Sequence, residues 1–241
     1  MPATTATPSL RGVKLVKSYG DGEARRTTLH EVTVDLFPGE LVLLMGPSGS
    51  GKSTLLAVLS GLLEPDSGQV LAEDDGHLRE VWQLTPKERE EYRRKHTGFI
   101  FQGYNLFPAL TARQQLEIVL KWGSGASNSD ARDRADEMLD KLGLAKNKSK
   151  KPAQLSGGEK QRVAIGRALV KNPNFVFADE PTSALDWENG QKVIELLRDA
   201  AHERKASILV VTHDHRILPF VDVYYHLEDG RLERRPLAAH H

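Results

Sequence analysis

The 241-residue chain has 33 lysine and arginine residues, 33 aspartate and glutamate residues, and no cysteine. The balanced charge gives no basic excess that would indicate a nucleic-acid partner, and the lack of cysteine excludes disulfides, thiolate chemistry and cysteine-ligated zinc. No stretch approaches the roughly 20 apolar residues that cross a bilayer, and the start of the chain lacks the layout of a signal peptide. We therefore expect a soluble, cytoplasmic protein with one large α/β unit.

The N-terminal part of the chain predicts a pair of antiparallel strands. Residues 1–9 are rich in Ala, Thr and Pro and are expected to be flexible. Alternating or β-branched apolar residues over 10–18 and 28–37, separated by a polar loop, predict the two strands. Tyr19 ends the first strand. A tyrosine in this place either packs on its own sheet or offers its ring to a purine base.

The apolar run 41–45 leads into a glycine-rich segment with the pattern G-x-x-x-x-G-K-S. The pattern is typical of a phosphate-binding loop, because glycines let backbone N–H groups converge on phosphate oxygens and the following helix start adds unpaired donors. We expect Lys52 to reach the β- and γ-phosphates and Ser53 to ligate Mg²⁺. The predicted nucleotide-binding residues of this segment are Gly46, Ser48, Gly49, Ser50, Gly51, Lys52, Ser53 and Thr54.

A short strand and a charged helix follow the phosphate-binding segment. A strand is predicted over 69–72, and 73–76 is expected to be a polar tip. Thr85 and the glutamate three residues later form a capping box, with proline at the first helical position. This predicts a largely solvated helix over 86–95.

A helical block is predicted in the middle of the chain. It follows a short buried strand over 98–101, which ends at Gln102, and an aromatic-bearing loop. Helices are predicted from the cap at residue 111 to about residue 122, and over 130–142. Because residues 111–150 would interrupt the nucleotide core, we interpret this block as a subdomain and a partner surface.

The segment Leu155–Arg162 reads L-S-G-G-E-K-Q-R and opens an amphipathic helix. Ser156 and Glu159 form a second capping box. A good helix start does not explain the two glycines, Gly157 and Gly158, since each costs about 1 kcal/mol relative to alanine inside a helix. A backbone that approaches an anion closely does explain them.

Two further apolar runs end in polar side chains that suit catalysis. The run 175–178 predicts a buried parallel strand that presents Asp179 and Glu180 at its carboxyl end. Asp179 would hold Mg²⁺ through water, and Glu180 would orient and deprotonate the attacking water. The alternative is a pair of exposed strand-end acids. A second strand over 207–211 presents His213, which we expect to face the γ-phosphate.

These motifs occur in an order that resembles the ATP-binding cassette (ABC) ATPases, the nucleotide-binding subunits of ABC transporters, across residues 10–235. The motifs are Tyr19, the phosphate loop, Gln102, the L-S-G-G-E signature, Asp179-Glu180, Ser183–Asp186 and His213. Phosphate loops occur in many enzymes, whereas this signature followed by Asp-Glu-Pro-Thr-Ser is specific to the class. The resemblance implies one α/β domain: a P-loop NTPase (RecA-like) core with an N-terminal antiparallel β-subdomain, over 10–102 and 160–235, and an ABC-specific α-helical subdomain over 103–159.

The resemblance also implies cofactors, partners and residue roles. ATP with Mg²⁺ would be enclosed in a head-to-tail dimer, in which Ser156, Gly157, Gly158 and Glu159 act on a γ-phosphate that Lys52 of a second copy holds. Gln102 would sense Mg²⁺ and the attacking water, so that the expected catalytic residues are Glu180, His213, Gln102 and Lys52. A transmembrane permease would be the second partner, at the cytoplasmic face of the inner membrane.

Within the family, the segments 98–106, 110–114 and 211–217 are most similar to the macrolide- and lipoprotein-export branch (MacB-, LolD- and DevA-like), with the cell-division cassette FtsE as a near relative. We therefore expect an ATPase that drives a separate permease in export or mechanotransmission. An ABC ATPase without transport is one alternative, although such proteins usually carry long coiled coils or two cassettes in one chain. A non-hydrolysing cassette is another, against which the intact Lys52, Asp179, Glu180 and His213 argue.

Overall fold

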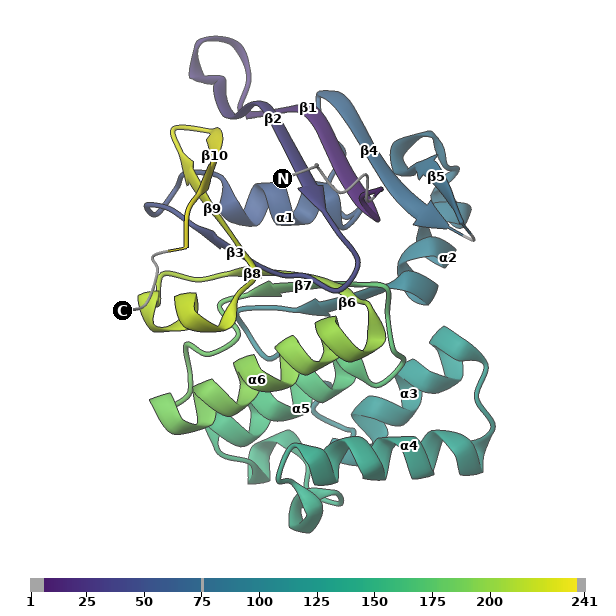
Figure 1. The fold of residues 1–241 in the computed structure, drawn as a ribbon. Coiled ribbons are helices and arrows are strands. Elements are labelled where there is room, and N and C mark those ends of the chain that lie inside the picture. Colours follow the sequence, from purple (N-terminus) through teal and green to yellow (C-terminus); the bar gives the residue numbers. More distant parts are fainter. Residues whose placement is uncertain (1–6, 75, 238–241) are drawn as a thin grey trace.

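The computed structural model describes residues 7–74 and 76–237, which form two β-sheets with a helix between them and further helices below (Figure 1). The larger sheet has the order β10-β9-β3-β8-β7-β6, in which all neighbours are parallel except the hairpin pair β9 and β10. Its central strands β3 and β8 are buried at every residue, as expected of parallel strands covered on both faces. The strands are β3 Leu41–Met45, β6 Thr97–Ile100, β7 Phe175–Asp179, β8 Ser207–Val211, β9 Val223–Glu228 and β10 Arg231–Arg235.

The smaller sheet is antiparallel, with the order β2-β1-β4-β5. Its strands are β1 Leu10–Tyr19, β2 Arg26–Leu36, β4 Ser67–Asp74 and β5 His77–Glu80. The predicted pairing of the first two strands is confirmed. The polar tip predicted over 73–76 is partly wrong: Glu73 and Asp74 extend β4 and pair with the short strand β5, which was not predicted because it lacks a run of apolar residues.

The prediction of a flexible N-terminus over 1–9 is wrong at Ser9, and residues 1–6 lie outside the described part of the chain. Ser9 is buried, and its hydroxyl lies 3.1 Å from the carbonyl oxygen of Leu36 and 2.5 Å from the hydroxyl of Ser207. The start of the smaller sheet is thereby attached to the first residue of β8, a central strand of the larger sheet.

Helix α1, Lys52–Leu59, lies between the two sheets (Figure 1). Leu55, Leu56, Val58 and Leu59 are buried among apolar residues of both sheets. Because α1 starts directly after the loop that follows β3, this packing holds the glycine-rich segment against the larger sheet. Burial of four aliphatic side chains contributes about 1.5–3 kcal/mol each.

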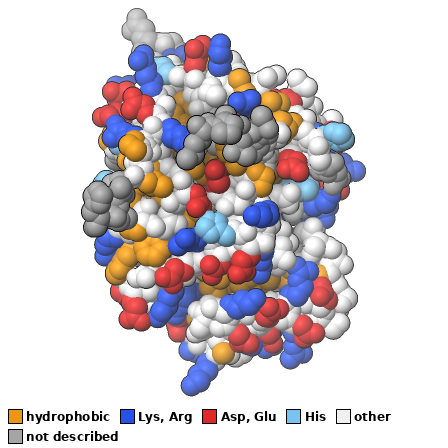
Figure 2. Space-filling view, viewed as in Figure 1, with side chains coloured by type: hydrophobic (Ala, Val, Ile, Leu, Met, Phe, Trp, Pro, Cys, Tyr) orange, Lys and Arg blue, Asp and Glu red, His pale blue; other side chains and the backbone are white. Residues whose placement is uncertain are grey.

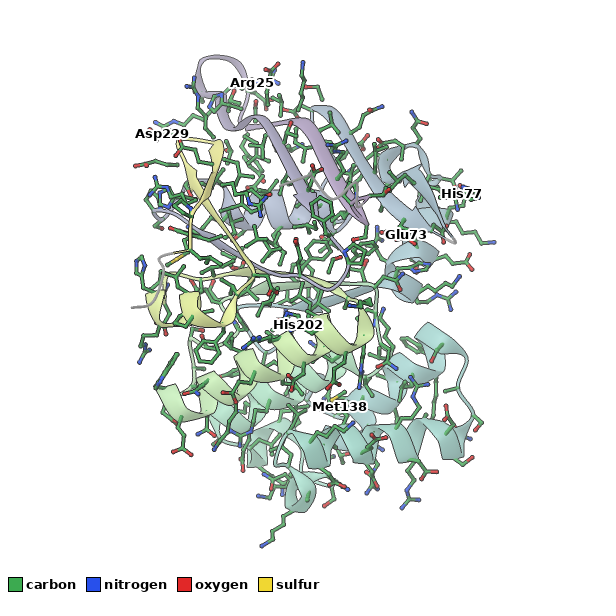
Figure 3. All side chains as sticks on the ribbon, viewed as in Figure 1. Arg25, Glu73, His77, Met138, His202 and Asp229 are labelled. Carbon is green, nitrogen blue, oxygen red and sulfur yellow. The ribbon has the colours of Figure 1, made fainter. Side chains whose placement is uncertain are left out.

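The other face of the larger sheet is covered by α5 Gly157–Leu169 and α6 Trp187–Arg204, with α3 Ala112–Ser124 and α4 Asn128–Lys141 beyond them (Figure 1). Met138 of α4 is buried in this helical layer (Figure 3). The remaining helix α2, Pro86–His96, has the predicted capping box and buries only Tyr92 and His96. The 3₁₀ turns are η1 Gly22–Ala24, η2 Val81–Gln83, η3 Ala145–Asn147, η4 Pro152–Gln154 and η5 His215–Phe220.

The surface mixes charges of both signs. Figure 2 shows acidic and basic side chains interspersed over this face, which agrees with equal numbers of the two in the chain. No helix within the described ranges is long and apolar enough to cross a membrane. The longest described helix, α6, has 18 residues, so the described part of the chain holds no long coiled-coil insertion.

Candidate nucleotide-binding and hydrolysis site

The segments predicted to bind and hydrolyse a nucleotide follow four neighbouring parallel strands. Leu44 of β3 pairs with Val211 of β8, which pairs with Asp179 of β7, and Ala178 pairs with Ile100 of β6. The carboxyl ends of these strands therefore share one edge of the sheet. Ligands of open parallel sheets bind at such an edge.

The phosphate loop is packed so tightly that its first and last glycines leave no room for a side chain. Gly46 has φ +152°, and a Cβ there would lie 1.9 Å from the carbonyl oxygen of Leu227 in β9. Gly51 has φ +101°, and its Cβ would lie 2.9 Å from the carbonyl oxygen of Thr28 in β2. The glycines thus let the loop pass between the end of β9 and the smaller sheet.

Lys52 begins α1 and bends back over its own loop. Its Nζ donates to the carbonyl oxygens of Gly46, at 2.9 Å, and Pro47, at 2.7 Å. The ammonium group therefore lies next to the phosphate loop. This loop leads into the N-terminus of a helix, where backbone N–H groups favour an anion. This position agrees with the predicted contact between Lys52 and phosphate oxygens.

Ser53 and Asp179 meet across the sheet edge, although they are far apart in the sequence. The Ser53 hydroxyl donates to Oδ2 of Asp179 at 2.9 Å. Burial, together with the neighbouring Glu180 charge, raises the pKa of Asp179 above its ordinary value. A cation beside this carboxylate would offset that cost, and Mg²⁺ is commonly held by one or two carboxylates with substrate phosphates. The hydroxyl and carboxylate therefore fit the predicted Mg²⁺ site.

Glu180 is held by contacts on both carboxylate oxygens. Its Oε1 lies 2.8 Å from Nδ1 of His213, and its Oε2 accepts a hydrogen bond of 2.9 Å from the buried hydroxyl of Thr212. The backbone of Glu180 has φ +49°, an uncommon value for a residue with a side chain, and strain of this kind clusters at functional sites. The side chain of His213 contacts Glu180 and is 81% exposed.

The partnership of Thr212 with Glu180 was not anticipated from the sequence. Thr212 directly precedes His213 after β8, so its position next to a predicted site residue was the only available signal. Gln102 lies two residues beyond the end of β6, in an exposed loop at the same edge of the sheet. No hydrogen bond of its side chain occurs within the described residues, and its predicted contact with Mg²⁺ stays a prediction.

The signature helix α5 starts as predicted. Ser156 is its N-cap: its hydroxyl accepts from the N–H of Glu159, and its own N–H donates to Oε2 of Glu159 at 2.7 Å. The second oxygen of Glu159 accepts from the side-chain amide of Asn147. Both carboxylate oxygens are therefore used to hold the start of the helix, and the predicted contact of Glu159 with a nucleotide stays a prediction.

The two signature glycines also allow close packing. A Cβ on Gly157 would lie 3.0 Å from the hydroxyl of Tyr104, and one on Gly158 would lie 3.0 Å from Cδ2 of Leu185. No hydrogen bond or ion pair within residues 7–74 and 76–237 connects 156–159 with the phosphate loop. The structure therefore contains two separate helix N-termini that suit phosphate.

The hydroxyl of Tyr19 reaches the start of α1. The residue is 47% exposed, and its hydroxyl lies 3.2 Å from the hydroxyl of Thr54 in α1. This contact places the hydroxyl of Tyr19 beside the first turn of α1. The predicted contact between the ring and a purine base stays a prediction.

The chain matches the family model for ABC transporters over residues 29–183. It is 41% identical to the lipoprotein-releasing system ATP-binding protein LolD of Legionella pneumophila, covering 94% of this chain and 97% of that protein. It is 40% identical to the macrolide export ATP-binding/permease protein MacB of Marinobacter nauticus, covering 90% of this chain and 33% of that longer protein. A solved structure, the dimeric post-hydrolysis state of the ATP-binding cassette MJ0796 bound to ADP and Pi, has a TM-score of 0.87 at 37% identity and covers 96% of this chain and 100% of that one. The chain therefore belongs to the ABC transporter family, as an ATP-binding subunit that hydrolyses ATP.

Proposed function

We propose that two copies of this chain enclose ATP between the phosphate loop of one copy and the signature of the other, and that hydrolysis drives a separate permease. The observation that carries the proposal is that one chain has two helix N-termini that suit phosphate and that carry different side chains. The start of α1 has Lys52, Ser53 and the nearby carboxylate of Asp179, whereas the start of α5 has Ser156 and the two signature glycines but no lysine of the phosphate loop. Each terminus supplies half of a site, and the dimeric form of the related cassette MJ0796 supports the pairing.

Each residue of the site has a distinct role in this proposal. Lys52 binds the γ-phosphate, Tyr19 stacks on the base, and Glu180 takes a proton from the attacking water. Thr212 and His213 hold the carboxylate of Glu180 in place. When Mg²⁺ is bound, it neutralises charge on the phosphates. Ser53, Asp179 and Gln102 would hold this ion.

The permease would contact an apolar groove beside the loop that contains Gln102. The groove has a volume of about 390 Å³ and lies between β6 and the helices α3 and α5. Two of its lining side chains are strongly exposed: Trp122, at 67%, and Phe107, at 52%. Exposed large aromatic residues are typical of interaction surfaces. We propose that a short apolar segment of the permease binds here, which would place the chain at the cytoplasmic face of the inner membrane.

The direction of transport is proposed from the relatives. The names of LolD and MacB refer to lipoprotein release and macrolide export. We propose that this chain likewise powers an export or mechanotransmission system. Purification of the chain from its native membrane, followed by identification of the membrane protein that accompanies it, tests this assignment.

Mixing two inactive variants tests the shared site. Lys52→Ala removes the lysine of one half-site and Ser156→Arg blocks the other half-site, so each variant alone should lose turnover. In an equal mixture, half of the dimers combine the two variants and contain one intact site. ATP hydrolysis should then reappear at about a quarter of the wild-type rate if the sites act independently. Normal turnover by Ser156→Arg alone would show that the signature is not part of the site.

A further inference from the structure

Arg216 connects two segments of the site region. Its guanidinium forms a two-point contact with Asp214, with Nε 2.9 Å from Oδ1 and Nη2 2.7 Å from Oδ2. Its Cζ also lies 4.5 Å from the ring centroid of Trp187, in a cation–π contact. The indole also contacts Phe220 edge to face, at 6.3 Å between ring centroids, so that Trp187 is itself held in place.

The Asp214 end of this contact leads to the carboxylate of Glu180. The N–H of Asp214 donates to the hydroxyl of Thr212 at 3.2 Å, and the same hydroxyl donates to Oε2 of Glu180 at 2.9 Å. Thr212 is completely buried, so its hydroxyl has little freedom to turn to other partners. The position of Asp214 therefore influences the orientation of the Glu180 carboxylate.

The Trp187 end of the contact leads to the same glutamate by another route. Trp187 is the first residue of α6 and directly follows the loop 181–186. Within this loop the hydroxyl of Ser183 donates to the carbonyl oxygen of Glu180 at 3.0 Å. Leu185 of the same loop packs against Gly158 at the signature. The contacts thus form a closed ring that begins and ends at Glu180 and touches the signature helix.

We propose that Arg216 and Trp187 are positioning residues for ATP hydrolysis: their contact closes the ring that orients the Glu180 carboxylate and ties it to the loop beside the signature. The inference rests on the proposed role of Glu180 as the base. An arginine suits this position because its planar guanidinium can pair with a carboxylate at two points and stack on an indole at the same time. A lysine presents a single ammonium group and reproduces only part of this geometry.

Steady-state ATP hydrolysis by the full chain tests the proposal. Arg216→Ala and Trp187→Leu should each lower kcat by about 10-fold to 100-fold, because small misplacements of a catalytic group have effects of this size. KM for ATP should stay within about twofold, since the ring does not include the phosphate loop or Tyr19. Trp187→Phe, which keeps an aromatic face for Arg216, should recover most of the loss.

Two controls separate positioning from folding. Arg216 is largely exposed, so its replacement should leave the melting temperature within about 3 °C of the wild-type value. Arg11 forms a similar exposed two-point pair with Asp35 on the smaller sheet, and Arg11→Ala should leave kcat unchanged.

The double variant Trp187→Leu/Arg216→Ala decides whether the two residues act together. Its kcat should equal that of the more impaired single variant, because either change opens the same ring. An unchanged kcat in Arg216→Ala, or losses that multiply in the double variant, would overturn the proposal. Glu180→Gln, measured alongside, separates the proposed base from the proposed positioning residues. Turnover that survives in Glu180→Gln refutes the role of Glu180 as the base. An inactive Glu180→Gln together with a fully active Arg216→Ala refutes only the positioning role of Arg216 and Trp187.

Discussion

The imidazole of His213 lies 2.8 Å from the carboxylate of Glu180, and the two residues are located at the ends of adjacent strands, β8 and β7. His213 is mostly exposed, while the side chain of Glu180 is only 13% exposed. The carboxylate is thus largely buried and contacts an imidazole that is open to solvent. A nucleotide bound at the sheet edge would approach both groups together.

Glu180→Gln should lower ATP hydrolysis by about 10²–10⁴-fold, because glutamine cannot accept the proton of the attacking water. ATP binding should persist, since the phosphate loop is unchanged, and the dimer should accumulate with ATP. Hydrolysis rates together with light scattering in the presence of ATP measure both effects. Glu188→Gln, at an exposed position in the first turn of α6, serves as the control. Near-normal turnover in Glu180→Gln would remove this residue from the role of base.

Asp179→Asn should stabilise the chain without nucleotide and weaken its stabilisation by Mg²⁺ and ATP. The pKa of Asp179 is raised in the folded state, so the folded state favours the protonated form. The stability that this proton provides is present at low pH and is lost as pH rises from about 4, the ordinary value, through the raised pKa. Above that range the wild-type protein carries an unfavourable buried charge, which asparagine removes.

Thermal unfolding at two pH values measures this effect. At pH 8 the melting temperature of Asp179→Asn should exceed the wild-type value, by about 2–4 °C for each kcal/mol removed. The difference should shrink at pH 4, and Asp199→Asn, at an exposed position of α6, should show no such change. A lower melting temperature for Asp179→Asn at pH 8 would mean that the hydrogen bond with Ser53 outweighs the cost of burial.

Local patterns accounted for the parts of this molecule that are built locally. The phosphate loop, the capping boxes at Thr85 and Ser156, the cap at Thr111 and the buried strands are each specified by residues within one short segment. Parallel strands also place their carboxyl ends together, which is why the proximity of Ser53 and Asp179 could be expected from motifs.

The contacts that were not foreseen join distant segments. Thr212 bonds to a glutamate 32 positions earlier, and Arg216 stacks on Trp187, 29 positions earlier; no spacing rule connects such pairs. Strand β5 was not predicted because its structure depends on pairing with β4 rather than on its own composition. Ser9 was taken for a flexible residue because the buried hydroxyl group that it meets belongs to Ser207, near the other end of the chain.

Lys171 provides a test of electrostatics outside the nucleotide site. Burial, with a smaller contribution from Arg94, lowers its pKa to about 8, and its ammonium group donates to the carbonyl oxygens of Arg93 and Arg94. Because the folded state disfavours the charged form, stability associated with this group is present above the ordinary value of 10.5 and is lost as pH falls through about 8.

Between pH 7 and 10, the melting temperature of Lys171→Met relative to that of the wild-type chain should therefore be highest near pH 7. The difference in melting temperature, variant minus wild type, should fall as pH rises from 7 to 10, since the wild-type lysine then loses its costly charge. Lys192→Met, at a largely exposed position of α6, is the control and should show no trend. An identical difference at both pH values for Lys171→Met would show that burial does not perturb this lysine.

Gly46→Ala tests the packing of the phosphate loop against β9. The added Cβ would lie 1.9 Å from the carbonyl oxygen of Leu227, so either the loop or the end of β9 has to move. We expect a loss of about 1–3 kcal/mol in the free energy of unfolding from overpacking, and weaker ATP binding because the loop N–H groups are displaced.

Gly125→Ala is the matched control: Gly125 also has positive φ, at +65°, but no atom lies within 4 Å of the added Cβ. It should lose only the cost of the left-handed backbone, about 1 kcal/mol, and bind ATP normally. Equal losses of stability in the two variants, with ATP binding intact in both, would show that backbone conformation alone, rather than contact with β9, requires glycine at position 46.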